Sequence, residues 1–171
     1  DTPVSRWTSS KSFEVTGTAE AGATVRVLVG TISVGVVQAD TATGAFRLSN
    51  VPLNVGVNRI TALASDSVGN ASSVSSNAID VHFDETAPVT VVENLPSGWQ
   101  RETVTVNVIG RDELGGSGIA ATYYTTDGSP PNTASPAVSG DGHIELSEGI
   151  FQFRFFSVDN AGNTESVKQA S

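Results

Sequence analysis

The sequence predicts an all-β protein built of two small β-sandwiches in tandem, and two observations carry this prediction. Residues 56–70 and 149–163 align without a gap, 93 positions apart, and each segment reads as a strand followed by an Asp-x-x-Gly-Asn turn. That interval suits one small sandwich of about 100 residues. Short runs in which Val, Ile, Thr and Phe alternate with polar residues recur along the chain, as is typical of half-buried strands.

A second coincidence places the domain boundary. The chain begins Asp1-Thr2-Pro3-Val4, and a related phrase, Asp84-Glu85-Thr86-Ala87-Pro88-Val89, opens the second half. Proline is tolerated at the start of a strand because it need not donate to the ladder there. We therefore expect one domain over residues 1–84 and another over residues 85–171.

In the first half, Val25, Val27 and Val29 alternate with Thr24, Arg26 and Leu28, and Ile60 and Ala62 share one face of the repeated strand. Phe13, Phe46 and Trp7 are the aromatic candidates for the first core, so Val, Ile and Ala must fill the rest. The predicted strands cover residues 12–19, 23–29, 33–39, 44–49, 57–65 and 72–83.

In the second half, Val104 and Val106 lie on one face of a strand, and Phe151, Phe153 and Phe155 lie on one face of another. We expect these residues, with one or both of Tyr123 and Tyr124, to form the second core. The predicted strands cover residues 88–93, 103–111, 119–126, 136–138, 142–147, 150–158 and 164–169.

Composition excludes several function classes. The chain has 18 acidic and 9 basic residues, a net charge of −9, and neither cysteine nor methionine. A surface of that sign repels phosphate backbones and anionic membranes, so nucleic-acid binding is not expected, whereas divalent cations are favoured. No thiolate chemistry is available, and no apolar run is long enough for membrane insertion.

Both halves resemble known families. Residues 13–25, FEVTGTAEAGATV, and the ending ASDSVGN at residues 64–70 resemble bacterial Ig-like adhesin repeats. GGSGI at residues 115–119 and YYTTDGSPP at residues 123–131 resemble Ig-like domains of the chitobiase/β-hexosaminidase C-terminal type. The resemblance implies Ig-like sandwiches in a large bacterial cell-surface or secreted protein, and it supplies no catalytic residues.

Acidic side chains are the first candidate site. In an Ig-like sandwich, the loops that contain Asp112 and Asp159 share the pole where the first strand enters, and the linker carries Asp84 and Glu85. Carboxylates converging at the joint between the domains would suit Ca²⁺, which takes 6–8 oxygen ligands. In the alternative interpretation these acids only close turns or cap loops, and no cofactor is required.

Aromatic residues are the second candidate site. Trp99, in the loop-like phrase Pro-Ser-Gly-Trp-Gln, and Tyr123 could stack on sugar rings, or they could pack against their own sandwich. The only histidines, His82 and His143, lie in no hydrolase or metalloprotease motif, so no enzyme is predicted.

The sequence therefore predicts a structural spacer or adhesive module pair, extracellular or on the cell surface. The expected partners are other domains of the same chain, with carbohydrate or a host or cell-surface protein as further candidates. The alternative is a carbohydrate-binding accessory module of a secreted glycosidase.

Overall fold

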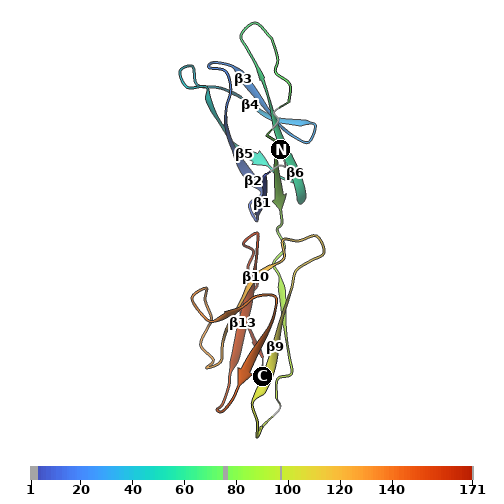
Figure 1. The fold of residues 1–171 in the computed structure, drawn as a ribbon, viewed down its shortest axis with the longest axis vertical. Coiled ribbons are helices and arrows are strands. Elements are labelled where there is room, and N and C mark those ends of the chain that lie inside the picture. The colour runs from blue at the N-terminus through green and yellow to red at the C-terminus, as the bar shows by residue number, and fades with distance from the viewer. Residues whose placement is uncertain (1–3, 75–76, 97, 171) are drawn as a thin grey trace. The chain divides into compact units, whose positions relative to one another are not determined.

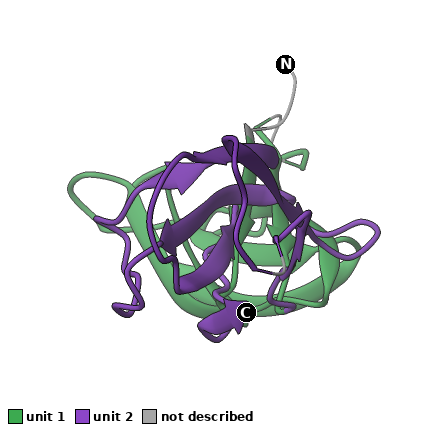
Figure 2. Ribbon diagram, turned by 90° about the horizontal axis from the view of Figure 1, so that it is seen from below, with its two compact units in different colours: residues 1–85 green, residues 86–171 purple. Residues whose placement is uncertain are grey.

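The computed structural model describes residues 4–74, 77–96 and 98–170, and the chain divides into two compact units, residues 1–85 and 86–171 (Figures 1 and 2). Every regular element in the described residues is a β-strand, so the all-β prediction is confirmed. The division lies one residue from the boundary that the sequence suggests.

The first unit is a sandwich of a five-stranded sheet, in the order β1-β7-β6-β3-β4, and a two-stranded sheet, β2-β5. Its first and last strands, β1 and β7, pair in parallel, whereas the other pairs are antiparallel. The strands are β1 (Val4–Thr8), β2 (Ser12–Thr18), β3 (Thr24–Val29), β4 (Ile32–Gln38), β5 (Ala45–Pro52), β6 (Gly56–Ser65) and β7 (Ile79–Phe83).

The core of the first unit is mostly aliphatic, as expected. Phe13 and Phe46 pack against it, but Trp7 does not belong to it: its side chain is 36% exposed and lies on His82, with ring centroids 4.6 Å apart. Phe83 takes the buried aromatic position instead. The buried cluster consists of Val15, Val27, Val51, Leu53, Ile60, Val81 and Phe83.

The second unit packs a four-stranded sheet, β11-β10-β13-β14, on a three-stranded sheet, β12-β9-β8, and all its strand pairs are antiparallel. Its strands are β8 (Val89–Glu93), β9 (Val104–Arg111), β10 (Ile119–Thr125), β11 (Ala137–Val138), β12 (Asp141–Leu146), β13 (Phe153–Asp159) and β14 (Lys168–Ala170).

Two of the three phenylalanines expected in the second core are there. Phe153 and Phe155 are buried in it, and Val104 and Tyr124 pack against it. Phe151 is 38% exposed, because β13 begins at Phe153 and the predicted strand starts three residues too early. The buried cluster consists of Val106, Val108, Ile144, Leu146, Phe153 and Phe155.

Two differences from the predicted strands concern the first unit. The sequence analysis missed β1, which has no strongly alternating pattern and exists through its parallel ladder with β7. The predicted strand over residues 72–83 is regular only from Ile79: Ser72 still pairs locally with Ala64, and the chain joins the sheet later. Residues 75 and 76 of that prediction lie outside the described residues.

The repeated motif forms the same turn in both units. The amide of Asn70 donates to Asp66 Oδ1 at 2.9 Å and its side chain to Oδ2 at 2.7 Å; Asn163 makes the same two bonds to Asp159, each at 2.8 Å. Gly69 and Gly162 occupy matching positions with φ of 93° and 95°, a region that favours glycine. The sequence repeat is therefore a structural repeat.

Replacing Phe153 by alanine should lower the free energy of unfolding of the second unit by about 3–5 kcal/mol, because a fully buried ring leaves a cavity. Phe151→Ala is the matched control, and its partly exposed ring should cost clearly less. Urea titrations of both variants measure the difference. Equal midpoints would show that the inward face of β13 is misassigned.

Candidate functional site

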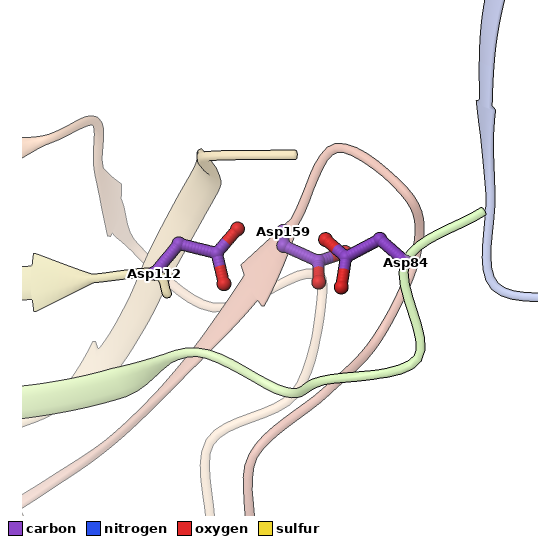
Figure 3. A group of neighbouring side chains, drawn as sticks. All are labelled: Asp84, Asp112 and Asp159. Carbon is purple, nitrogen blue, oxygen red and sulfur yellow. The ribbon is translucent and has the colours of Figure 1, made fainter. Parts of the chain in front are cut away.

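Three of the four predicted acidic residues lie together. Asp84, in the segment that leads into the second sandwich, Asp112 and Asp159 each offer a carboxylate oxygen, and these oxygens all lie within 4.8 Å of one another (Figure 3). Asp84 and Asp159 are only 2% exposed. Burial weakens the screening of like charges by water, so this grouping carries an electrostatic cost.

Local hydrogen bonds hold two of the three carboxylates. Asp112 follows β9 and accepts the amides of Glu113 at 2.9 Å and Gly118 at 2.6 Å, so its loop closes around it. Asp159 ends β13 and accepts both donors of Asn163 in the repeated turn. The turn and capping roles considered from the sequence are therefore present, and cation binding stays a prediction.

Glu85 is not a member of this group. Its carboxylate is paired with the ammonium of Lys11 at 3.1 Å, and its side chain is 46% exposed. The neighbouring Asp84 is held through its backbone, since its amide donates to the carbonyl of Thr8 at 3.0 Å.

The donor set suits a hard cation. Three carboxylates supply three to six of the oxygens that Ca²⁺ requires, and water or backbone carbonyls can complete the shell. The four bonds described here, two to Asp112 and two to Asp159, come from neutral N–H groups and do not offset the charges of these carboxylates.

The two aromatic candidates, Trp99 and Tyr123, differ in exposure and packing. Trp99 lies in the loop between β8 and β9 and is 92% exposed. Tyr123 is half-buried on β10, and one face of its ring is stacked on Phe156 with centroids 5.2 Å apart. Tyr123 thus packs on its own sheet, as one interpretation of the sequence proposed, while Trp99 keeps both faces of its ring open.

A groove opens in the first unit, with Phe46, Ala62 and Ala64 among the residues of its wall. Two acidic residues, Glu20 and Asp66, also line it, and Asp66 is bonded to Asn70 within the turn. Histidines are not among the residues that line the groove. Apolar side chains thus share the groove with the two carboxylates.

The sequence analysis did not single out Glu165, which is the centre of a buried polar network in the second unit. Its carboxylate accepts the amides of Ser157 at 2.9 Å and Thr90 at 3.1 Å, and it pairs with Lys168 at 2.6 Å. When the gapless repeat is extended by two residues, Glu165 aligns with Ser72. This difference, an acid in place of a serine, is the feature of the sequence that could have singled out Glu165.

Residues 103–169 match the family model described as the chitobiase/beta-hexosaminidase C-terminal domain. The match confirms the resemblance of the second sandwich to that type of domain. No helix that could cross a membrane occurs in the part of the chain that the structure describes.

No curated protein matched the chain. Among solved structures, the chain is similar to the fibronectin(III)-like modules of CbhA from Clostridium thermocellum, with 14% identity, a TM-score of 0.49, and coverage of 99% of this chain and 89% of that one. It is also similar to β-glucuronidase 3 of Bacteroides uniformis, with 16% identity, a TM-score of 0.30, and coverage of 98% of this chain and 23% of that one. At these values neither likeness carries an inference about function.

The turn at Asp66 should be sensitive to acid. The side-chain amide of Asn70, followed by the backbone amide of the same residue, holds the pKa of Asp66 below its ordinary value. A lowered pKa in the folded state means that the stabilisation is present above the pKa of the unfolded chain and is lost as the pH falls through the folded pKa. In an NMR titration, the midpoint of the Asp66 carboxyl should lie below the ordinary value of about 3.9. Asn70→Ala should raise this midpoint. An unchanged midpoint would contradict the role given to Asn70.

Proposed function

We propose that the chain is a pair of non-catalytic spacer modules in a longer extracellular protein. The observation that carries the proposal is the direction of the terminal strands. In the first unit, β1 and β7 pair in parallel from Val4 opposite Ile79 to Thr8 opposite Phe83. The chain therefore enters that sandwich at one pole and leaves it at the other.

The second unit reaches the same result with terminal strands in different sheets. β8 begins where β9 ends, and residues 112–118 then lead to the start of β10 at that pole. β13 runs against β10, and β14 runs against β13. β8 and β14 therefore both run away from the pole where the chain enters, so the chain leaves at the opposite pole.

Entry and exit at opposite poles favour a role in series. Each module adds its own length between the domains that flank it, whereas a hairpin-like module would return the chain to its starting point. The match of residues 103–169 to a C-terminal domain family, rather than to a catalytic one, supports a non-catalytic accessory role. The partners that we propose are other domains of the same secreted or surface-exposed chain.

A tether assay tests the spacer role. The chain is fused between a surface anchor and a ligand-binding reporter, beneath a polymer brush, and capture of ligand-coated beads is measured. Capture should rise from no module, to the second module, to both, because folded modules keep their length whereas a flexible chain grows only as the square root of its residue number. The matched control is a Gly/Ser linker of 171 residues. Equal capture with that linker would refute the proposal.

A carbohydrate-binding accessory role is the second candidate, and the open indole of Trp99 favours it. Retention on a polysaccharide matrix that Trp99→Ala abolishes and Trp7→Ala preserves would select this role. If neither the wild type nor the variants are retained, the carbohydrate-binding role is refuted and the spacer role stands.

We also propose that Asp84, Asp112 and Asp159 bind one calcium ion. The support is the closeness of three carboxylates, two of them buried, whose mutual repulsion a divalent cation would offset. In this proposal the turn bonds of Asp112 and Asp159 orient their oxygens for the ion, so turn formation and cation binding use the same side chains.

Calcium at a hundredfold excess over its Kd should raise the free energy of unfolding by about 2.7 kcal/mol, since it binds only the folded state. Thermal melts with calcium and with chelator measure this, and calorimetry gives the stoichiometry. Asp112→Asn/Asp159→Asn should abolish the shift. Asp66→Asn is the matched control, because it makes the same change in the copy of the turn in the first module. Identical melts with and without calcium would leave the three acids as formers of turns and loops alone.

A further inference from the structure

The polar network around Glu165 joins the first strand of the second sandwich to its last two. Besides the bonds to Ser157 and Thr90, the carboxylate accepts the hydroxyl of Thr90, and Lys168 Nζ donates to the carbonyl oxygen of Thr90 at 3.1 Å. Thr90 is 4% exposed and the Glu165 side chain 5%, so these two members of the network are shielded from water, whereas the Lys168 side chain is 35% exposed. Hydrogen bonds to a charged group in such a place are among the strong ones.

The side chains of Glu165 and Lys168 bind the backbone of Thr90 as a neighbouring strand would. β8 is an edge strand whose ladder partner is β9, where Thr90 lies opposite Gly110. The Glu165 carboxylate accepts a hydrogen bond from the N–H of Thr90 at 3.1 Å, and the Lys168 ammonium donates one to the carbonyl oxygen of Thr90, also at 3.1 Å. The ion pair between Glu165 and Lys168, three residues apart, therefore satisfies both backbone groups of one residue on the sheet edge.

Hydroxyl groups extend the network across the sandwich. Ser157 Oγ lies 2.5 Å from the Thr90 hydroxyl and 2.6 Å from the Thr122 hydroxyl, and Thr122 and Ser157 are fully buried. Thr90 belongs to the three-stranded sheet, and Thr122 and Ser157 belong to the four-stranded sheet. The two sheets, which share no backbone ladder among the residues that the structure describes, are thus linked by hydrogen bonds through the core.

The first module shows what the network adds. Ser72 stands opposite Glu165 in the repeat, and its Oγ accepts the amide of Ala64 at 3.0 Å, as Glu165 accepts that of Ser157 at 2.9 Å. The local bond is therefore common to both modules. Only the longer side chain of Glu165 also reaches Thr90 on the first strand of its module.

The direction of the strands gives this link a mechanical consequence. Tension in a series spacer pulls the start of β8 and the end of β14 towards opposite poles, so the two strands must slide past each other. In the first module, the parallel ladder between β1 and β7 opposes the same sliding with backbone hydrogen bonds. In the second module, where β8 and β14 lie in different sheets, the network makes the corresponding connection.

We propose that Thr90, Glu165 and Lys168 form a shear clamp that sets the resistance of the second module to stretching. The inference rests on the proposed spacer function for its biological use. The clamp itself is a property of the module, and pulling on single molecules measures it.

The test stretches the full chain by its ends at constant force. The chain contains no cysteine, so introduced cysteines give unique handles. Glu165→Ser copies the first module and keeps the local bond to Ser157, and Glu165→Gln is a second variant that keeps the size of the side chain. Either change should speed unfolding of the second module about 10- to 100-fold, as expected for loss of a charge-assisted bond at the transition state. Unfolding of the first module is the internal reference and should not change.

Asp141→Asn is the matched control, because it removes an exposed ion pair with Arg111 between two strands of one sheet. Its unfolding rate under the same force should stay within about twofold of the wild type. Unchanged rates in both Glu165 variants would overturn the clamp.

A second pulling axis separates a clamp from a general loss of stability. Handles at Gly140 and Ile150 flank β12 and do not load β8 against β14. Along this axis, the Glu165 variants and the wild type should unfold at similar rates, and an equal acceleration along both axes would overturn the clamp. Failure of the spacer proposal can be told apart from failure of the clamp proposal. In the first case the tether assay gives equal capture with the flexible linker, while the effect of the Glu165 variants still depends on the pulling axis.

Discussion

Both modules depend on one hydrogen-bonded turn, in which an aspartate carboxylate accepts the backbone and side-chain amides of an asparagine four residues later. The turn ends the long central strand and reverses the chain. It also places residue 72 or 165 against the strand that has just ended. In the second module the same turn holds Asp159 within the acidic group and brings Glu165 beneath β8. Both proposed sites therefore depend on the local geometry of this turn.

The two copies of the turn serve different surroundings. Asp66 is half-buried, less so than Asp159, and water can screen the repulsion between its charge and other acids. Asp159 is 2% exposed and lies with two further carboxylates, so its charge must be balanced within the protein. Likewise Ser72 makes a local bond, whereas Glu165 carries a buried charge that Lys168 balances. One backbone motif thus makes two different sets of contacts, according to which residues the neighbouring strands place beside it.

The accuracy of the sequence analysis followed the range of the interactions. Alternation placed Val25, Val27 and Val106 correctly on inward faces, because the period of two is a property of neighbouring residues. Phe151 continued the alternation of Phe153 and Phe155 but lies before β13 begins, since the ladder with β14 starts at Phe153. The prediction that Trp7 belongs to the first core was wrong. Its side chain lies beside His82 on the outer face of the sheet, because Trp7 on β1 is paired with His82 on β7.

By itself, the sequence determined the all-β class and the Asp-x-x-Gly-Asn turns, since both depend on residues only a few positions apart, and the tandem repeat, since aligning the chain with itself reveals it. It also indicated Asp84, Asp112 and Asp159 as candidates for one site. Only the tertiary structure decided that these three converge while Glu85 pairs with Lys11. Only the structure showed that Glu165 reaches Thr90, 75 positions earlier in the chain. Such contacts depend on how two sheets pack face to face, and no local pattern of residues encodes that distance.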